Sequence, residues 1–402
     1  MKNRPIITIP SLLFLFGLVL VAFNLRSSIT AVGPLISTIR LETNLSNSVI
    51  GMLTTLPLLA FGVFSTVAPK ISRRWGNETT VFIALIILTI GILLRSTGMV
   101  FTLFLGTAML GLGIAICNVL LPSIVKGRYP KKMGLLTGIY STSMALMAAL
   151  ASGLSIPLAH RLNLGWESSL ALWAILAGLA VVVWIPQLFS QKINSKAIIP
   201  KNSNIWSSKL AWQVTLFMGL QSCIFYCIIA WIPEILVSRG IDVPTAGWLL
   251  TLTQLVGLPA TLLVPILATR MSNQKIIVLA ITFLYFLGFL GIYLGGSIMF
   301  IIVCMVFLGL AQGAGISLSL SLFGLRSENA HDAANLSGMA QSGGYLLAAT
   351  GPLLLGLFYD LSQSWSIGFL FILTMIMAMG IFGVYASRDR YVFQLEQEKL
   401  RA

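Results

Sequence analysis

The sequence predicts an all-α membrane protein that crosses the bilayer with twelve helices. Of its 402 residues, 57% are hydrophobic and only 9% are Asp, Glu, Lys or Arg, whereas soluble globular chains carry roughly 25% charged residues. Twelve apolar runs are each long enough to supply the ~20 residues that a helix needs to cross the hydrocarbon core. The formal net charge is +14, but the charges lie in short gaps between the apolar runs, which argues against nucleic-acid binding.

The apolar runs follow one another along the chain and are apolar on every face. Strands of a membrane β-barrel would instead alternate apolar and polar side chains over about ten residues. Helices also satisfy their own backbone N–H and C=O groups inside lipid. The predicted spans cover residues 11–35, 48–69, 79–97, 101–125, 134–158, 166–187, 210–236, 245–268, 276–295, 298–322, 336–359 and 365–386.

The basic residues favour one side of the membrane. If both termini are cytoplasmic, the inner segments hold 20 of the 25 Lys and Arg residues and the outer ends hold four, Arg40, Arg95, Arg161 and Arg239. This asymmetry follows the positive-inside rule. The sequence therefore predicts a multi-pass protein of the plasma membrane with cytoplasmic N- and C-termini.

The two halves of the chain repeat one plan. Pro265 follows Pro69 by 196 residues, and Trp365 follows Trp166 by 199. The longest polar connection lies at the midpoint and is rich in Lys, Asn and Ser, a composition typical of a linker. Six spans, a cytoplasmic linker and six more spans are the plan expected of a two-bundle alternating-access transporter. The predicted domains are an N-terminal six-helix bundle at 1–187, the linker at 188–209, a C-terminal six-helix bundle at 210–387 and a cytoplasmic tail at 388–402.

One basic residue, Arg26, lies deep in a predicted span. It lies about 4.5 Å past the midpoint of the run 11–35 and about 13 Å from its outer end. No Asp or Glu lies deep in any run. An intramembrane cation costs at least about 2.5 kcal/mol and normally faces a cavity. We therefore predict that Arg26 contacts an anionic or electronegative substrate, together with neighbouring Asn24 and Thr30. The alternative is that carbonyls, hydroxyls and water solvate Arg26 without any role in binding.

Other polar residues in the middle of spans are weaker candidates, because amide side chains also hold membrane helices together. Asn118, Gln221 and Tyr226 are the candidates that a family resemblance favours. The sequence carries no Ser/His/Asp set, metal cluster or paired acids and no ATP-binding motif. It therefore predicts a protein that is not an enzyme and that holds no metal or cofactor. Active transport would depend on an ion gradient, and exchange and facilitated transport are the alternatives.

A set of short strings along nearly the whole chain resembles the cyanate porter family of the major facilitator superfamily, a family that includes a 2-nitroimidazole exporter. The sequence as a whole resembles a Bacillus-type member. The resemblance implies the major facilitator fold and directs Asn118, Gln221 and Tyr226 toward a central cavity. The strings include Asn24-Leu-Arg26, Asn118-Val-Leu-Leu-Pro122, Phe225-Tyr226 with Trp231-Ile-Pro233, Leu336-Ser-Gly338, Gly344-Tyr345 and Gly351-Pro352.

The sequence departs from the superfamily pattern in the loop after the second span. That loop generally has the pattern Gly-x-x-x-Asp-Arg-x-Gly-Arg-Arg. Here the stretch is Ser65-Thr-Val-Ala-Pro-Lys-Ile-Ser-Arg-Arg74. Both glycines and the Asp are absent, which weakens the case for a gate built on that Asp. Arg73 and Arg74 remain as candidates for a cytoplasmic gating loop.

The predicted function is secondary transport of a small anionic or electronegative, cyanate-like solute by a protein that acts as a monomer. The alternative is an exporter of small heterocyclic compounds such as nitroimidazoles. The resemblance implies a proton as a second partner. Since no buried carboxylate is present to carry that proton, either the substrate brings it, or an end residue such as Glu234 or Asp360 takes part.

Overall fold

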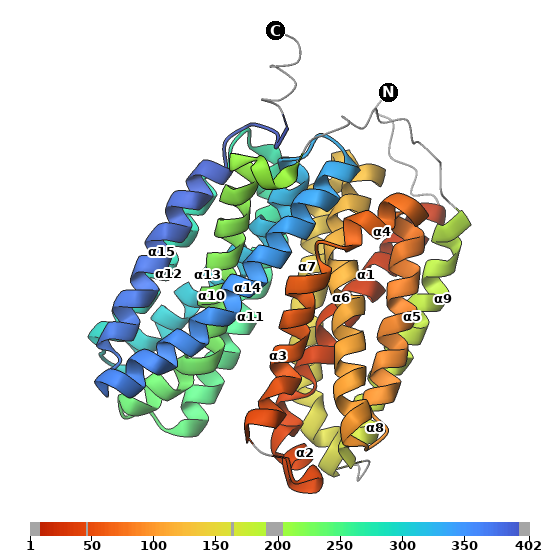
Figure 1. Ribbon diagram of the computed structural model, residues 1–402. Coiled ribbons are helices and arrows are strands. Elements are labelled where there is room, and N and C mark those ends of the chain that lie inside the picture. The colour runs from red at the N-terminus through yellow and green to blue at the C-terminus, as the bar shows by residue number, and fades with distance from the viewer. Residues whose placement is uncertain (1–8, 46, 162–164, 190–203, 394–402) are drawn as a thin grey trace. The chain divides into compact units, whose positions relative to one another are not determined.

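The computed structural model describes residues 9–45, 47–161, 165–189 and 204–393, and within these ranges every regular element is helical (Figure 1). This confirms the predicted all-α class. In chain order the elements are α1 (Ile9–Thr30), η1 (Gly33–Leu35), α2 (Ile36–Thr43), α3 (Asn47–Phe64), α4 (Ala68–Trp75), α5 (Asn77–Arg95), α6 (Val100–Arg128), η2 (Pro130–Lys132), α7 (Met133–Ile156), the π-helical turn η3 (Pro157–Arg161), α8 (Gly165–Ala171), α9 (Trp173–Phe189), η4 (Ile205–Ser207), α10 (Lys209–Ser238), α11 (Val243–Arg270), α12 (Lys275–Leu294), α13 (Ile298–Leu325), α14 (Ala330–Ser362) and α15 (Ser366–Ala386).

Among the described residues, eleven helical segments are long and apolar enough to cross a membrane. The number rises to twelve, the predicted value, if Thr55–Phe64 and Ala68–Trp75 form one span bent by 56°. The apolar run 48–69 predicts a continuous helix, so this break between α3 and α4 is a difference from the sequence expectation. Pro69 lies in the first turn of α4, where a proline is tolerated because its missing N–H has no intrahelical partner there.

Backbone contacts divide the chain into two compact units. Unit 1 consists of Met1–Ala60, Lys70–Leu121 and Ser143–Pro200, and unit 2 consists of Phe61–Pro69, Pro122–Thr142 and Lys201–Ala402. Two segments from the first half of the chain thus join the second half, which the predicted domains do not anticipate. Most of the predicted linker (190–203) and of the predicted tail (394–402) lies outside the described residues. The six-plus-six division remains a prediction.

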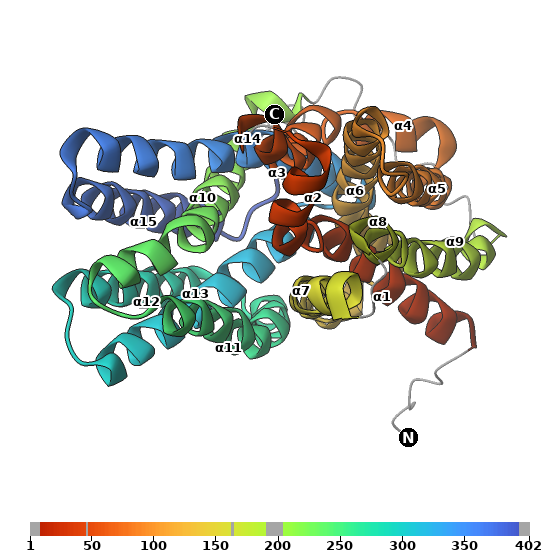
Figure 2. The ribbon, with the colours of Figure 1, turned by 90° about the horizontal axis from the view of Figure 1, so that it is seen from below.

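In unit 1, α1 packs antiparallel to α9, and Figure 2 shows the two helices side by side. Gly17 makes room for an indole, since a Cβ at this position would lie 3.3 Å from a ring carbon of Trp184. Further along, the Asn24 side-chain amide donates to the Leu176 carbonyl oxygen at 3.3 Å. The Trp184 indole N–H donates to the Glu78 carbonyl oxygen at 3.0 Å, which connects α9 to α5. Small and polar side chains therefore set the spacing of these helices.

In unit 2, α10 packs on α14 and α11 packs on α13 through glycines. A Cβ at Gly257 would lie 2.9 Å from the Gly309 carbonyl oxygen, and a Cβ at Gly219 would lie 3.0 Å from the Gly344 Cα. Any larger residue at these positions would push the backbones apart. Close approach of this kind is the usual way in which membrane helices gain packing energy.

The end of α3 packs on α14 inside unit 2, along a line of small residues that we call the Gly62–Ser342 seam. The Ser342 hydroxyl donates to the Gly62 carbonyl oxygen. A Cβ at Gly338 would lie 2.6 Å from the Ser65 carbonyl oxygen. The aromatic rings of Phe61 and Tyr345 lie beside these contacts, with their centroids 5.0 Å apart. The seam consists of Phe61, Gly62, Ser65, Gly338, Ser342 and Tyr345.

One buried arginine in unit 2 connects the end of α13 to the end of α15 and to the start of α12. Arg326, at the end of α13, is only 2% exposed. Its Nε donates to the Ala386 carbonyl oxygen at 2.8 Å, and its Nη2 donates to the Ser387 carbonyl oxygen at 3.0 Å and to the Gln274 side chain. Its Nη1 lies 3.9 Å from a carboxylate oxygen of Asp389. Burial lowers the pKa of Arg326 to about 10, so the guanidinium stays charged at neutral pH.

We expect Arg326→Ala to destabilise the protein by roughly 3–5 kcal/mol, because removing one partner from a buried ionic network leaves the others unpaired. Arg388→Ala is the matched control, because Arg388 is exposed. Its guanidinium carbon lies 4.5 Å from the ring centroid of Tyr385. Thermal unfolding of the detergent-solubilised variants measures both effects. Equal melting temperatures for the two variants would contradict the structural role of Arg326.

Candidate functional site

The predicted cation, Arg26, lies within the membrane-spanning segment Leu12–Leu35, nine residues before Leu35. Its side chain is half-buried. The Thr30 hydroxyl donates to the Arg26 carbonyl oxygen at 3.1 Å, which leaves the hydroxyl oxygen of Thr30 as an acceptor. The position inside a span agrees with the sequence prediction.

Asn24 is fully buried and its amide is committed to structure. The Nδ2 group donates to the Leu20 carbonyl oxygen at 2.8 Å within α1 and to the Leu176 carbonyl oxygen at 3.3 Å in α9. Its Oδ1 atom has no hydrogen-bond partner among the described residues. The side chain therefore joins two helices with its donors and keeps one acceptor uncommitted.

The remaining predicted contacts lie in both units. Asn118 is buried in α6, in the part of that helix that belongs to unit 1. Gln221 is fully buried in α10 of unit 2 and packs against Gly315, where a Cβ would lie 2.7 Å from the Gln221 Cγ. The Gln221 Nε2 has no hydrogen-bond partner in the described part of the chain. Tyr226 is half-buried, with its ring 5.3 Å from that of Phe225 in an edge-on arrangement.

Asn24, Arg26 and Thr30 lie on α1, Asn118 lies on α6 of the same unit, and Gln221 and Tyr226 lie on one helix of the other unit. Among the residues described, no three His, Cys, Asp or Glu side chains gather closely enough to hold a metal ion.

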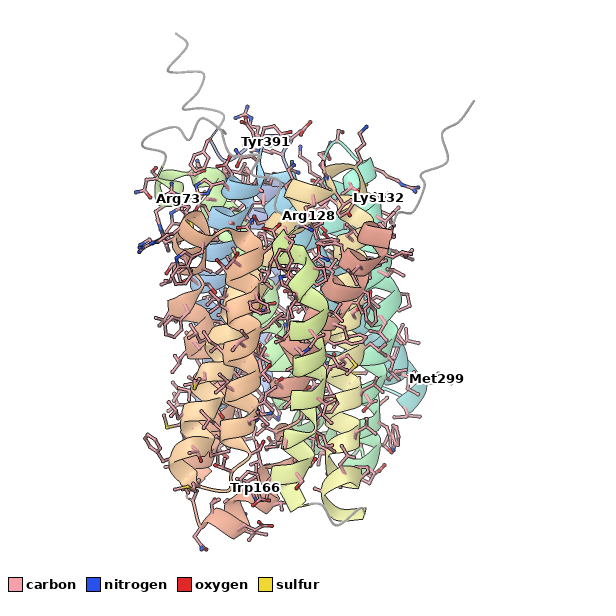
Figure 3. All side chains as sticks on the ribbon, turned by 90° about the vertical axis from the view of Figure 1, so that its right-hand side faces the viewer. Arg73, Arg128, Lys132, Trp166, Met299 and Tyr391 are labelled. Atoms are coloured by element: carbon pink, nitrogen blue, oxygen red, sulfur yellow. The ribbon has the colours of Figure 1, made fainter. Side chains whose placement is uncertain are left out.

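The two predicted gating residues, Arg73 and Arg74, are exposed in the last turn of α4. Within unit 1, Arg73 lies at the end opposite Trp166 (Figure 3). Their exposure fits contact with water or with lipid headgroups.

Arg95 is a buried cation that sequence reasoning missed, because it lies at the end of an apolar run, where an arginine normally reaches the interface. In the structure it is 1% exposed, and its Nη1 donates to the Ser28 carbonyl oxygen at 2.6 Å. Its Nε and Nη2 atoms have no partner among the described residues. The glycine spacing carries a signal that could have revealed this: a Cβ at Gly106 would lie 2.7 Å from the Cβ of Arg95, so α6 covers the backbone at Arg95.

The amino-acid sequence matches the family model "Major Facilitator Superfamily" over residues 14–349 and 214–401. It is 50% identical over 391 residues to an uncharacterised transporter, YycB, of Bacillus subtilis, covering 97% of each chain. It is 39% identical to the 2-nitroimidazole transporter of Escherichia coli, covering 97% of this chain and 98% of the relative. The cyanate transport protein CynX of Escherichia coli is 27% identical, with 87% and 91% covered.

Solved structures of transporters share the fold. The proton:xylose symporter XylE superimposes with a TM-score of 0.73 at 14% identity, covering 97% of this chain and 99% of that one. FucP in its outward conformation gives a TM-score of 0.74 at 13% identity, covering 93% and 98%. Together with the relatives, these matches confirm the resemblance found in the sequence: the chain belongs to the major facilitator superfamily.

Proposed function

We propose that this protein is a secondary transporter that moves a small anionic or electronegative, cyanate-like solute across the plasma membrane by alternating access. Membership of the superfamily makes it a multi-pass membrane transporter. The observation that carries the choice of solute is Arg26, a half-buried guanidinium inside a membrane-spanning segment.

The charge balance of the spans supports an electronegative substrate. In the described candidate spans every Asp and Glu lies within four residues of a segment end, whereas Arg26 lies nine residues inside. A cation at that depth faces the interior of the bundle or a water-filled cavity and pairs with polar groups there, because hydrocarbon cannot solvate it. An anion that binds beside Arg26 replaces lost hydration with a charge-assisted hydrogen bond.

The other contacts of the proposed site supply hydrogen bonds. The Gln221 Nε2 is a donor without a partner among the described residues and can donate to an anion. The Asn24 Oδ1 and the Thr30 hydroxyl oxygen are acceptors, so they suit only a substrate that itself carries a donor. Asn118 and Tyr226 add an amide and a phenol. We assign Asn24, Arg26, Thr30 and Asn118 to the proposed N-terminal bundle, and Gln221 and Tyr226 to the proposed C-terminal bundle.

The proposed architecture has six helices in each bundle, a cytoplasmic linker, cytoplasmic termini and a monomeric working unit. The interval of 196–199 residues between matching Pro and Trp residues supports the repeat. Within unit 2, Arg128 and Lys132 lie at the same end as Tyr391 (Figure 3), which fits a basic cytoplasmic side. Arg73 and Arg74 belong to the proposed gating loop on that side.

A second candidate function is export of small heterocyclic or nitroaromatic compounds. The observation that favours it is the higher identity to the 2-nitroimidazole transporter, 39%, than to the cyanate transport protein, 27%. A nitro group presents two electronegative oxygens, so Arg26 suits either class of substrate.

In proteoliposomes we expect Arg26→Gln to weaken the affinity for the transported solute about 10- to 100-fold, since a hydrogen bond to a charged group contributes about 1.5–3 kcal/mol. Arg26→Lys should restore part of that loss. Initial uptake rates of labelled cyanate and of labelled 2-nitroimidazole, measured side by side, decide between the two functions.

Arg270→Gln is the matched control for Arg26→Gln, because Arg270 is an exposed arginine at the end of α11. The control should transport like the natural protein. Unchanged affinity for both solutes in Arg26→Gln would remove Arg26 from the site.

The structure corrects the expectation that no carboxylate is buried: among the described residues Asp332, in the first turn of α14, is buried, and its Oδ2 accepts from the Asn329 amide at 2.9 Å. Glu234 and Asp360 are both exposed. Since the Asp332 carboxylate is engaged at the start of its helix, we take the substrate to carry the proton.

In vesicles loaded with pyranine, we expect the lumen to acidify when a weak-acid substrate enters. Vesicles that carry Glu234→Gln or Asp360→Asn should acidify to the same extent as vesicles with the natural protein. Loss of acidification in one variant, with uptake intact, would make that residue the proton carrier. Uptake with no pH change would exclude proton coupling.

Arg95 holds the part of α1 that carries Arg26. Its guanidinium fixes the Ser28 carbonyl, two residues after Arg26 on the same helix. Two of its nitrogens lack partners in the described chain, so its burial is incompletely compensated by hydrogen bonds. A buried charge of this kind is poor evidence for a stabilising role, and an apolar residue of similar size is often neutral or stabilising in its place. We therefore assign Arg95 a positioning role for the α1 segment that carries Arg26.

We expect Arg95→Met to keep or raise the melting temperature while it raises KM about tenfold, since the Arg26 segment loses its anchor. Arg95→Lys should recover most of the affinity, because an ammonium also donates to the Ser28 carbonyl. The readouts are thermal unfolding and the separation of KM from kcat. A lowered melting temperature with unchanged KM would make Arg95 a purely structural residue.

A further inference from the structure

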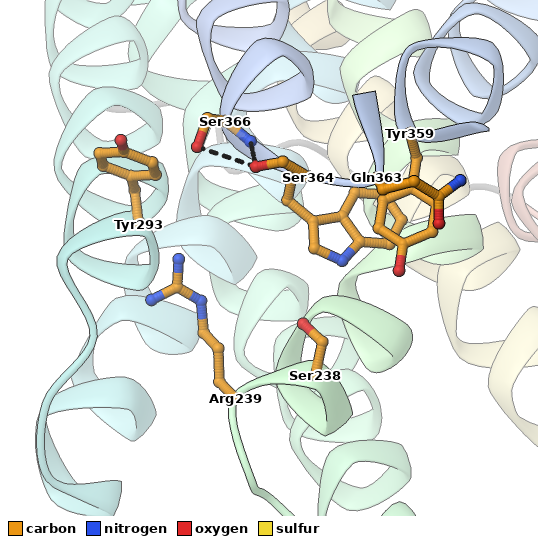
Figure 4. Close-up of a pocket in the computed structure, with 8 residues that line it drawn as sticks. Ser238, Arg239, Tyr293, Tyr359, Gln363, Ser364 and Ser366 are labelled. Carbon is orange, nitrogen blue, oxygen red and sulfur yellow. Dashed lines mark hydrogen bonds between the residues drawn. The ribbon is translucent and has the colours of Figure 1, made fainter. Parts of the chain in front are cut away.

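A pocket of about 300 Å³ opens at one end of unit 2 (Figure 4). It lies where α10, α14 and α12 end and α15 begins, and Arg326 lies at the other end of α15. Under the predicted topology this end faces the outside of the cell. The volume falls at the lower end of the range for small-molecule sites. The lining residues are Ser238, Arg239, Tyr293, Tyr359, Gln363, Ser364, Trp365 and Ser366.

The lining of the pocket favours an anion. Arg239 is the one charged side chain among the described residues that line it, and the others contribute hydroxyls, an amide and aromatic rings. The guanidinium carbon of Arg239 lies 6.0 Å from the ring centroid of Tyr293 and 5.7 Å from that of Phe369. These rings hold the arginine in place through cation–π attraction without neutralising its charge. Figure 4 shows Arg239 between Tyr293 and Ser238.

The pocket also contains a hydrogen-bond donor without an acceptor. Trp365 is 9% exposed and stacks on Tyr359 with ring centroids 4.2 Å apart. Its indole N–H has no partner among the described residues. Buried indole N–H groups normally find an acceptor. The neighbouring Trp231 follows that rule, because its N–H donates to the Pro352 carbonyl oxygen at 2.9 Å.

The predicted internal repeat indicates which group is absent. Arg239 follows Arg40 by 199 residues, the same interval that separates Trp365 from Trp166. In unit 1 the Trp166 indole donates to the carboxylate of Glu42 at 2.9 Å. The same interval from Glu42 leads to Ile241, so the second copy has the arginine and the indole but not the carboxylate.

The next residue, Asp242, does not replace that carboxylate. Its Oδ2 atom accepts from the Thr245 backbone N–H at 3.0 Å and caps the first turn of α11. This hydrogen bond holds the pKa of Asp242 below its usual value. The carboxylate is therefore ionised and committed to the helix end.

We propose that this pocket binds a planar organic monoanion, an aromatic or heteroaromatic carboxylate, whose carboxylate takes the place that Glu42 occupies in the first copy. Its two oxygens accept from the Arg239 guanidinium and the Trp365 indole N–H. Its ring packs against the aromatic side chains that line the pocket. The site is separate from Arg26, which belongs to unit 1, and does not depend on the proposed transport function.

Equilibrium dialysis of labelled benzoate against the purified full-length protein tests the proposal. Binding should be saturable, and neutral benzamide should not compete. We expect Arg239→Gln to lower the affinity about tenfold or more and Trp365→Phe to lower it less, in line with the loss of a charged and of a neutral hydrogen bond. Arg388→Gln is the matched control, an exposed arginine stacked on a tyrosine at the other end of unit 2, and should bind like the natural protein.

Ile241→Glu is the sharpest variant, because it restores the carboxylate of the first copy. It should abolish benzoate binding and leave the melting temperature equal or higher. This variant decides the matter if Arg239→Gln fails to fold.

Wild-type affinity in folded Arg239→Gln or in Ile241→Glu would overturn the proposal, and so would equal binding of benzamide. Loss of benzoate binding in Arg26→Gln would also overturn it, because the ligand would then occupy the transport site. Normal cyanate and nitroimidazole uptake by Arg26→Gln would contradict the proposed function alone.

Discussion

The cost of a positive charge away from water determines how this chain uses its arginines. Arg95 and Arg326 are both almost fully buried, and both donate to carbonyl oxygens at the C-terminal ends of helices: Ser28 in the last turn of α1, and Ala386 and Ser387 at the end of α15. These carbonyls have no intrahelical partner and carry the negative end of the helix dipole. A helix end thus supplies what a carboxylate supplies elsewhere. Arg26 lies four residues before the end of α1, and we propose that its charge also contacts a ligand.

Much of the fold could be predicted from the sequence, because a backbone inside lipid must satisfy its own hydrogen bonds. An apolar run of about twenty residues has few alternatives to a membrane helix, and the expected spans correspond to described helices. The break between α3 and α4 could not be predicted, because Ser65 and Pro69 are compatible with a continuous helix as well as with a bend. The residues assigned to each unit could not be predicted either, because contacts made by 61–69 and 122–142 depend on tertiary packing.

The candidate site divides in the same way. The position of Arg26 inside a span could be predicted from sequence, since a cation inside an apolar run stands out by its position alone, and its role as a substrate contact stays a prediction. Arg95 could not, because its burial depends on how closely α6 approaches at Gly106. The unpartnered indole of Trp365 was also hidden, because the repeat places a matching Trp in each half and only the structure shows that one has an acceptor. Asn24 was found, but its amide proves to join α1 to α9, a use that composition and spacing do not distinguish from ligand binding.

The Gly62–Ser342 seam has a thermodynamic consequence for any motion that separates its two sides. Its contacts are of two kinds: the Ser342 hydroxyl and the Gly338 Cα meet backbone carbonyls, whereas Gly62 packs on the Leu346 side chain and Phe61 on Tyr345. Separation in water would expose both kinds of group, and polar and apolar hydration change the heat capacity with opposite signs. The two contributions therefore partly cancel along this line. A step limited by the seam would have an activation enthalpy that changes less with temperature, and a less curved Arrhenius plot, than a step limited by a wholly apolar interface.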